Sequence, residues 1–200
     1  MWSQPTLLDG GLDAPRARRF EPERLLLDER SWVDLAPGWL EGADHAFAEL
    51  AADLPWFTGE RVVYHQRHVE PRRSAGWDDP GEHPVSTAMR DALEARYGRR
   101  FHVVFCNLYR DGDDAVAWHR DRIHRSDPEP LVAILTLGAT RTFSLRPLGG
   151  GSSTRLRPAS GDLLVMGGRS QHEWEHAVLR TRRPVGPRIS VTLRAVAPTD

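Results

Sequence analysis

Apolar residues recur with the spacing of an α-helix in two stretches of the chain. Between Leu40 and Leu54 an apolar side chain returns at helical intervals, and Pro55 ends the pattern. The second stretch follows Ser86, a residue type that often caps the start of a helix, and it closes at Gly98. We therefore expect two amphipathic helices, each of which covers a sheet.

Beyond Gly98 the chain changes to short β-type runs that Gly, Pro and Asp residues separate. Strands are predicted from Phe101 to Tyr109, Ala115 to His119, Leu131 to Leu137, Thr142 to Arg146, Asp162 to Met166, Glu173 to Val178 and Arg188 to Val196. Many short strands at nearly regular spacing are typical of a β-sandwich or barrel. The expected fold class is mainly β with α-helices, an α+β protein.

Two segments lack such patterns. Residues 1–30 are rich in Arg, Pro, Glu and Asp, so we expect an N-terminal arm there and a single domain over residues 31–200. Residues 65–84 hold His, Arg, Pro, Trp and Asp without periodicity. We predict a long irregular connection in this second segment, of the kind that often forms a lid over a functional site.

Composition narrows the function classes. A formal net charge of −1 gives the whole surface no general attraction for a polyanion, so such a partner would need a local patch. All 27 cationic residues are arginine, which makes any one arginine cluster a weaker indication of function. The single cysteine, Cys106, excludes an internal disulfide. Without a signal-peptide pattern or a long uncharged run, we expect a soluble, cytoplasmic monomer with no membrane partner.

A possible metal site begins at His119 and Asp121. Residues two apart on a strand project from one face, so both side chains can reach the same ion. His176, in another predicted strand, supplies a third ligand, and two histidines with one carboxylate are typical of non-haem Fe(II) oxygenases with open coordination positions. His172 is a rival third ligand. The alternative for His176 is a core histidine bonded to the backbone.

The alternation of polar and apolar residues over residues 188–194 has two interpretations. The polar face is either exposed to solvent or directed into a barrel, where Arg188 and Arg194 would need carboxylate partners. A dicarboxylate ligand would supply both partners. Asn107 and Tyr109 share a face of another predicted strand and offer an amide and a phenol to the same pocket.

Together these motifs resemble the AlkB family of Fe(II)- and 2-oxoglutarate-dependent dioxygenases. The resemblance covers roughly residues 54–194 and includes Asn107-x-Tyr109, His119-x-Asp121, Gly161-Asp162-Leu163-Leu164-Val165-Met166, Trp174-x-His176 and Arg188-x5-Arg194. It implies a double-stranded β-helix core, of the jelly-roll or cupin-like kind, with helices packed on one side and a nucleotide-recognition lid. It also implies that Fe(II) is bound by His119, Asp121 and His176, with 2-oxoglutarate and O2 as co-substrates.

The same resemblance assigns roles around the iron. Arg188, with help from Tyr109, would pair with the distal carboxylate of 2-oxoglutarate. Asn107 and Arg194 would help to place the end of 2-oxoglutarate that chelates the iron.

The resemblance also suggests substrate contacts in the lid. In Pro71-Arg72-Arg73 and the following Trp77, Arg72 would contact a phosphate and Trp77 would position the substrate strand. Without the resemblance, an arginine and a tryptophan in a loop are more often simply solvated. The chain departs from the family at Ile123, where members that repair cationic methylated bases commonly have a carboxylate.

The expected function is oxidative demethylation of N-alkylated nucleobases, such as 1-methyladenine and 3-methylcytosine, in DNA or RNA. Such an oxidoreductase releases formaldehyde, succinate and CO2, and in DNA repair it would act on a single-stranded or flipped base. Ile123 keeps open an alternative, the same dioxygenase chemistry on a protein, lipid or small molecule. A non-catalytic binding module is a further alternative.

Overall fold

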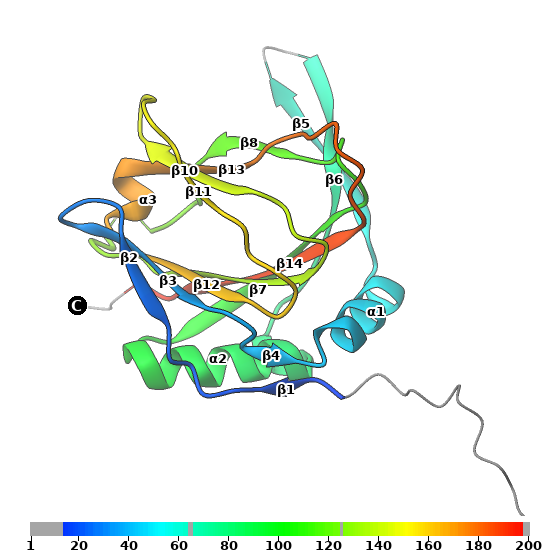
Figure 1. The fold of residues 1–200 in the computed structure, drawn as a ribbon, viewed down its shortest axis with the longest axis horizontal. Coiled ribbons are helices and arrows are strands. Elements are labelled where there is room, and N and C mark those ends of the chain that lie inside the picture. The colour runs from blue at the N-terminus through cyan, green and yellow to red at the C-terminus, as the bar shows by residue number, and fades with distance from the viewer. Residues whose placement is uncertain (1–13, 64–65, 125, 198–200) are drawn as a thin grey trace, which may run out of the picture.

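The computed structural model describes residues 14–63, 66–124 and 126–197 (Figure 1). The strands are β1 Arg16–Ala17, β2 Glu23–Leu26, β3 Ser31–Ala36, β4 Leu40–Glu41, β5 Phe57–Val63, β6 Gln66–Trp77, β7 Phe101–Tyr109, β8 Val116–His119, β9 Val132–Gly138, β10 Phe143–Pro147, β11 Thr154–Leu156, β12 Leu163–Gly168, β13 Trp174–Val178 and β14 Arg188–Ala195. The helices are α1 Ala43–Asp53, α2 Pro84–Tyr97 and α3 Ser170–Glu173, with a 3-10 turn, η1, at Pro80–Glu82.

Two antiparallel sheets form the body of the molecule. The larger has the strand order β2-β3-β12-β9-β14-β7-β6-β5, and the smaller has the order β11-β10-β13-β8. The two helices α1 and α2 lie on the face of the larger sheet that points away from the smaller one (Figure 1). The prediction of a mainly β fold with helices on one side is therefore confirmed, and two sheets of antiparallel strands match a double-stranded β-helix.

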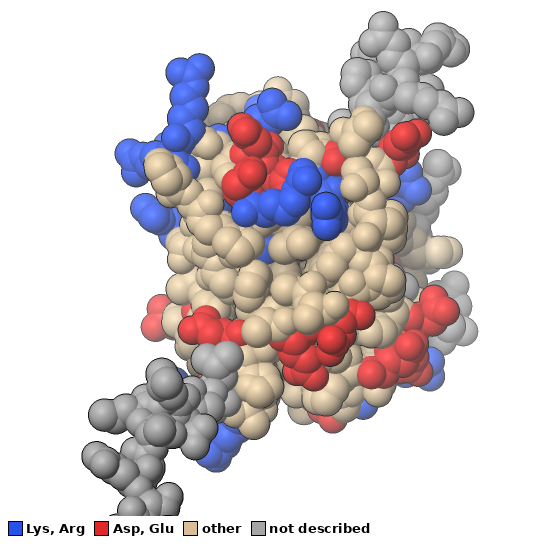
Figure 2. Space-filling model, turned by 90° about the vertical axis from the view of Figure 1, so that its right-hand side faces the viewer, with Lys and Arg blue, Asp and Glu red and all other residues tan. Residues whose placement is uncertain are grey.

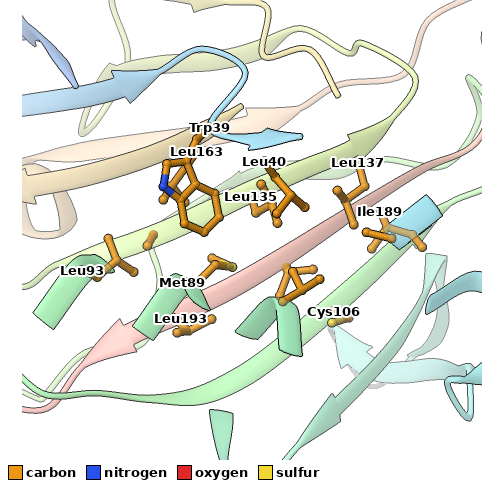
Figure 3. Packing of buried hydrophobic residues seen from close by; sticks show 14 of the residues in the cluster. Trp39, Leu40, Met89, Leu93, Cys106, Leu135, Leu137, Leu163, Ile189 and Leu193 are labelled. Atoms are coloured by element: carbon orange, nitrogen blue, oxygen red, sulfur yellow. The ribbon is translucent and has the colours of Figure 1, made fainter. Parts of the chain in front are cut away.

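The central strands of the larger sheet are buried on both faces, and their alternating residues serve two apolar cores. On β12, Leu163 and Val165 join the core under the helices, whereas Leu164 and Met166 join the core between the sheets. Figure 3 shows the first core, in which side chains of α2 meet those of the sheet. Its labelled members are Trp39, Leu40, Met89, Leu93, Cys106, Leu135, Leu137, Leu163, Ile189 and Leu193.

The start of α2 differs from the prediction. The helix begins at Pro84 with His83 as its N-cap, and the His83 Nδ1 accepts a hydrogen bond from the N–H of Val85 at 3.1 Å. Ser86 lies inside the helix, where its hydroxyl donates to the carbonyl of Pro80 at 2.7 Å. Proline fits the first helical turn because it has no N–H to leave unpaired there, so the helix starts before the predicted serine cap.

The prediction of an irregular connection over residues 65–84 is wrong. Most of this segment is β6, which pairs with β5 on one side and β7 on the other. Backbone pairing with two neighbours defines this strand, and its side chains carry no periodic signal. Residues 64 and 65 lie outside the described residues.

The segment before α1 also differs from the prediction in two smaller respects. Leu40, expected to open the first helix, lies in β4 and pairs with Ala17 of β1, and α1 begins after Gly42. Within the expected N-terminal arm, β1 pairs with β4 and β2 pairs with β3, while residues 1–13 lie outside the described part of the chain. Among the described helices, none has the length and apolar character needed to cross a membrane.

Two glycines with positive φ give a matched test of this packing. Gly161 has φ +88°, and a β-carbon there would lie 2.5 Å from the carbonyl oxygen of Leu40, whereas Gly98 has φ +63° and open space around it. We expect Gly98→Ala to lower the free energy of unfolding by about 1 kcal/mol through backbone strain alone. Gly161→Ala should cost about 3 kcal/mol or more, because a backbone contact must also shift.

Thermal and urea denaturation of both variants would measure the difference. For a domain of this size each kcal/mol corresponds to a shift of about 2–4 °C in Tm. Equal losses in the two variants would contradict the close approach of Gly161 to Leu40.

Candidate functional site

A cavity of about 1000 Å³ is lined by residues of both sheets. The polar face of β14 forms one wall and contributes Arg188, Ser190, Thr192 and Arg194. The apolar face of the same strand, with Ile189, Val191 and Leu193, packs under the helices. The polar face is therefore turned into the molecule, and the interpretation of β14 as a solvent-exposed alternating strand is wrong.

Three metal-binding side chains meet on the opposite wall. His119 on β8 and His176 on β13 are direct cross-strand partners, and their ring centroids lie 4.2 Å apart. Asp121 follows β8 by two residues, and the donor atoms of the three side chains all lie within 4.8 Å of one another. The arrangement has the donor set and the open side that a non-haem iron site requires.

The two imidazole rings are oriented so that each can offer a nitrogen to a cation. The Nδ1 of His119 lies 2.8 Å from the carbonyl oxygen of Ala117, which can only accept a hydrogen, so the lone pair is left on Nε2. Burial lowers the pKa of His176 to about 4, and its ring stacks on Phe143 at a centroid distance of 5.4 Å. Each imidazole is thus held in one orientation with a nitrogen available as a ligand.

His172, the rival third ligand, is directed elsewhere. It lies in α3, and its Nε2 is bonded to the carbonyl oxygen of Asp127 at 2.8 Å. Among the described residues it does not belong to the metal-binding group.

Asp121 lies beyond the end of β8, and two contacts fix its position. One carboxylate oxygen accepts a hydrogen bond from Nη2 of Arg194 at 3.1 Å. Its backbone N–H donates to the side-chain oxygen of Gln171, which is only 2% exposed, at 2.9 Å. Sequence reasoning missed Gln171, because a glutamine fifty residues away carries no local signal of this contact.

Arg188 is buried without a carboxylate. It is 2% exposed, and its Nε and Nη1 atoms have no hydrogen-bond partner among the described residues. Its Nη2 donates to the hydroxyl of Thr136 at 3.1 Å, and its guanidinium carbon lies 5.2 Å from the ring centroid of Tyr109. Burial lowers the pKa of Arg188 below its usual range. An unpaired buried guanidinium is costly, so the site fits a ligand that brings a carboxylate.

Asn107 and Arg72 are joined at the cavity wall. The side-chain oxygen of Asn107 accepts hydrogen bonds from Nε of Arg72 at 2.7 Å and from the hydroxyl of Ser74 at 3.3 Å. Its amide nitrogen is therefore the group that it can offer to a ligand. Trp77 does not line this cavity, because it packs with the core under the helices and stacks on His83 at 5.1 Å. The structure thus brings Arg72, but not Trp77, to the site.

Arg141 is a second buried arginine that sequence reasoning missed. Its guanidinium donates to the backbone carbonyls of Asp111 at 2.7 Å, Asp114 at 3.1 Å and Leu179 at 2.8 Å. It thereby ties the segment between β7 and β8 to the segment after β13, and both segments contribute to the cavity wall. Ile123 lies outside this cavity and lines a neighbouring pocket with Gln171 and His172.

Comparisons with known proteins agree with this geometry. A family model described as the 2OG-Fe(II) oxygenase superfamily matches residues 35–194. The chain is 32% identical over 192 residues to alpha-ketoglutarate-dependent dioxygenase alkB homolog 3 of Bos taurus, a match that covers 84% of this chain and 67% of the relative. It is 29% identical over 215 residues to the DNA oxidative demethylase ALKBH2 of Mus musculus, with coverage of 95% and 88%.

A solved structure supports the fold. The structure of OsALKBH1 superimposes with a TM-score of 0.59 at 15% identity, and the match covers 86% of this chain and 99% of that one. The family model spans most of the chain, and the relatives are named as an alpha-ketoglutarate-dependent dioxygenase and a DNA oxidative demethylase. The chain therefore belongs to the AlkB family within the 2OG-Fe(II) oxygenase superfamily.

Proposed function

We propose that this dioxygenase removes N-alkyl groups from nucleobases of DNA or RNA by oxidation. The observation that carries the proposal is the metal-binding triad at one wall of a cavity whose other wall holds the buried guanidinium of Arg188, which has no carboxylate partner among the described residues. Fe(II) with 2-oxoglutarate and O2, when bound, supplies the oxidation that turns an N-methyl group into formaldehyde and yields succinate and CO2.

The residues of the chain divide this work between the two sheets. His119, Asp121 and His176 would hold the metal, and burial lowers the pKa of His176 to about 4, which keeps its imidazole neutral. Arg188, beside Tyr109, binds the distal carboxylate of 2-oxoglutarate, because a planar guanidinium matches a carboxylate with two parallel hydrogen bonds.

The end of 2-oxoglutarate nearest the metal needs its own contacts. Arg194 donates to Asp121, and its Nε has no hydrogen-bond partner among the described residues. It can therefore hold Asp121 in place and also donate to the co-substrate. Asn107 offers its amide nitrogen to the same end. These contacts replace water around the co-substrate and fix its orientation before the base arrives.

The names of the relatives and the distribution of charge support a nucleic-acid substrate. Figure 2 shows most arginines of one face toward its upper end, where they lie beside acidic side chains, and further acidic side chains along its lower part. The cavity is lined by Arg72, Arg120, Arg122 and Arg180, which can neutralise phosphates. A base from a duplex would have to be flipped out of the stack at a cost of roughly a few kcal/mol, which favours single-stranded substrates. Separately, we expect the protein to act as a cytoplasmic monomer.

The decisive test is mass spectrometry of a single-stranded oligonucleotide that carries one 3-methylcytosine, incubated in air with protein, Fe(II), 2-oxoglutarate and ascorbate. The wild type should remove one methyl group, and His119→Ala should remove none. If 2-oxoglutarate is consumed without change in any methylated oligonucleotide, the substrate is of another class and the proposal is wrong.

Metal binding can be tested without turnover. Under anaerobic conditions His119→Ala and Asp121→Ala should weaken Mn(II) or Co(II) binding at least about a hundredfold, since each removes one of three protein ligands. His172→Ala is the matched control, because this histidine is bonded to a backbone carbonyl, and it should bind metal like the wild type. If His172→Ala were the only variant to lose metal, the proposed ligand set would be wrong and His172 would be a metal ligand.

Co-substrate binding gives an independent prediction for Arg188. Calorimetry with 2-oxoglutarate and Mn(II) should show a loss of about 2–3 kcal/mol of binding free energy for Arg188→Met, the usual size of a charge-assisted pair. Arg188→Lys should recover only part of this loss, because an ammonium lacks the planar fork. Arg180→Met, at an exposed position on the same cavity, should change the affinity little; an equal loss there would contradict a specific role of Arg188.

A further inference from the structure

Acidic side chains are scarce in this cavity. Among the described residues that line it, only Asp121 and Glu70 carry a carboxylate, against six arginines. Asp121 belongs to the metal-binding group and is bonded to Arg194. Glu70 is therefore the single lining carboxylate that the metal site does not use.

A bulge in β6 brings Glu70 to the cavity. Thr58 pairs with Arg73 and Glu60 pairs with Val69, so Gly59 of β5 stands opposite three residues of β6, 70–72. A bulge of this kind redirects side chains at functional sites. The Glu70 carboxylate lies against Gly59, where an added β-carbon would be 3.4 Å from the Glu70 Oε2.

Glu70 also balances a positive charge. Its Oε2 lies 3.5 Å from Nη2 of Arg72, whose Nε is committed to Asn107. Both side chains are largely shielded from solvent, with 24% exposure for Glu70 and 14% for Arg72. Without Glu70, a base that entered the cavity would face an uncompensated guanidinium, and a cationic base would be repelled.

Building on the proposed function, we propose that Glu70 is a specificity residue that makes this site prefer N-alkylated bases with a positive charge over neutral ones. A carboxylate has about four acceptor positions, and the contact with Arg72 leaves most of them free. A base such as 3-methylcytosine is cationic and carries an exocyclic amino group that can donate to them. The carboxylate thus offers both charge neutralisation and a hydrogen-bond acceptor.

The experiment compares two lesions that differ in charge and little in shape. One oligonucleotide carries 3-methylcytosine, a cation, and the other carries the neutral 3-methylthymine at the same position. For wild type and Glu70→Gln we would measure kcat/KM by mass spectrometry, and Kd by fluorescence anisotropy with Mn(II) and 2-oxoglutarate. The variant should lose about tenfold in its preference for 3-methylcytosine in both measurements, the size expected for one partly shielded charge pair.

Two further variants separate an effect of the Glu70 charge on lesion preference from a general effect of the protein's net charge. Asp78→Asn makes the same change of net charge at an exposed residue just after β6 that does not line the cavity, and it should keep the wild-type preference. Glu70→Asp retains the charge and should keep most of the preference. Thermal denaturation of each variant would verify that it is folded.

The outcomes are distinct. An unchanged preference in Glu70→Gln, or an equal loss on both lesions, would overturn the inference, because the second result means that Glu70 acts only by positioning Arg72. Wild-type protein that demethylates neither lesion would overturn the proposed function, and the inference with it. A selective loss on the cationic lesion alone supports both.

Discussion

The buried positive charge on β14 is the constraint on which the rest of the site depends. One face of this strand supplies Ile189, Val191 and Leu193 to the core under the helices, so the other face must point between the sheets. Arg188 is thereby enclosed with unpaired donors, and burial of a guanidinium without a counter-charge is unfavourable. Packing of the apolar core thus fixes the guanidinium of Arg188 in a position where an anionic ligand can neutralise its charge.

The smaller sheet positions the metal-binding side chains, and it does so in two different ways. His119 and His176 are aligned by backbone pairing of β8 with β13, and strand positions hold side chains more rigidly than loops do. Asp121 lies outside the strand and depends instead on Gln171 and Arg194. The site combines two ligands fixed by sheet geometry with a third fixed by side-chain contacts.

Local spacing explains which features the sequence reveals. The alternation along β14 follows from strand geometry, so it can be predicted from adjacent residues. The spacing of His119 and Asp121 also marks the pair in the sequence, but Asp121 lies beyond β8 and reaches the site through its contacts with Gln171 and Arg194. The direction in which β14 turns its polar face depends on where the helices pack, and that is a property of the whole fold. Gln171 and Glu70 reach the site through long-range contacts and a bulge, which no periodic pattern marks. The start of α2 was misplaced for a smaller reason, since both Ser86 and His83 can cap a helix.

The division of the site between two sheets has a thermodynamic consequence. The metal-binding side chains belong to or follow strands of the smaller sheet, the arginines belong to the larger one, and the contact of Asp121 with Arg194 bridges them. A metal ion held by the first set and 2-oxoglutarate held by the second, as proposed above, would be coupled through this contact. Any effect of one ligand on the affinity of the other is reciprocal, so each changes the binding of the other by an equal factor.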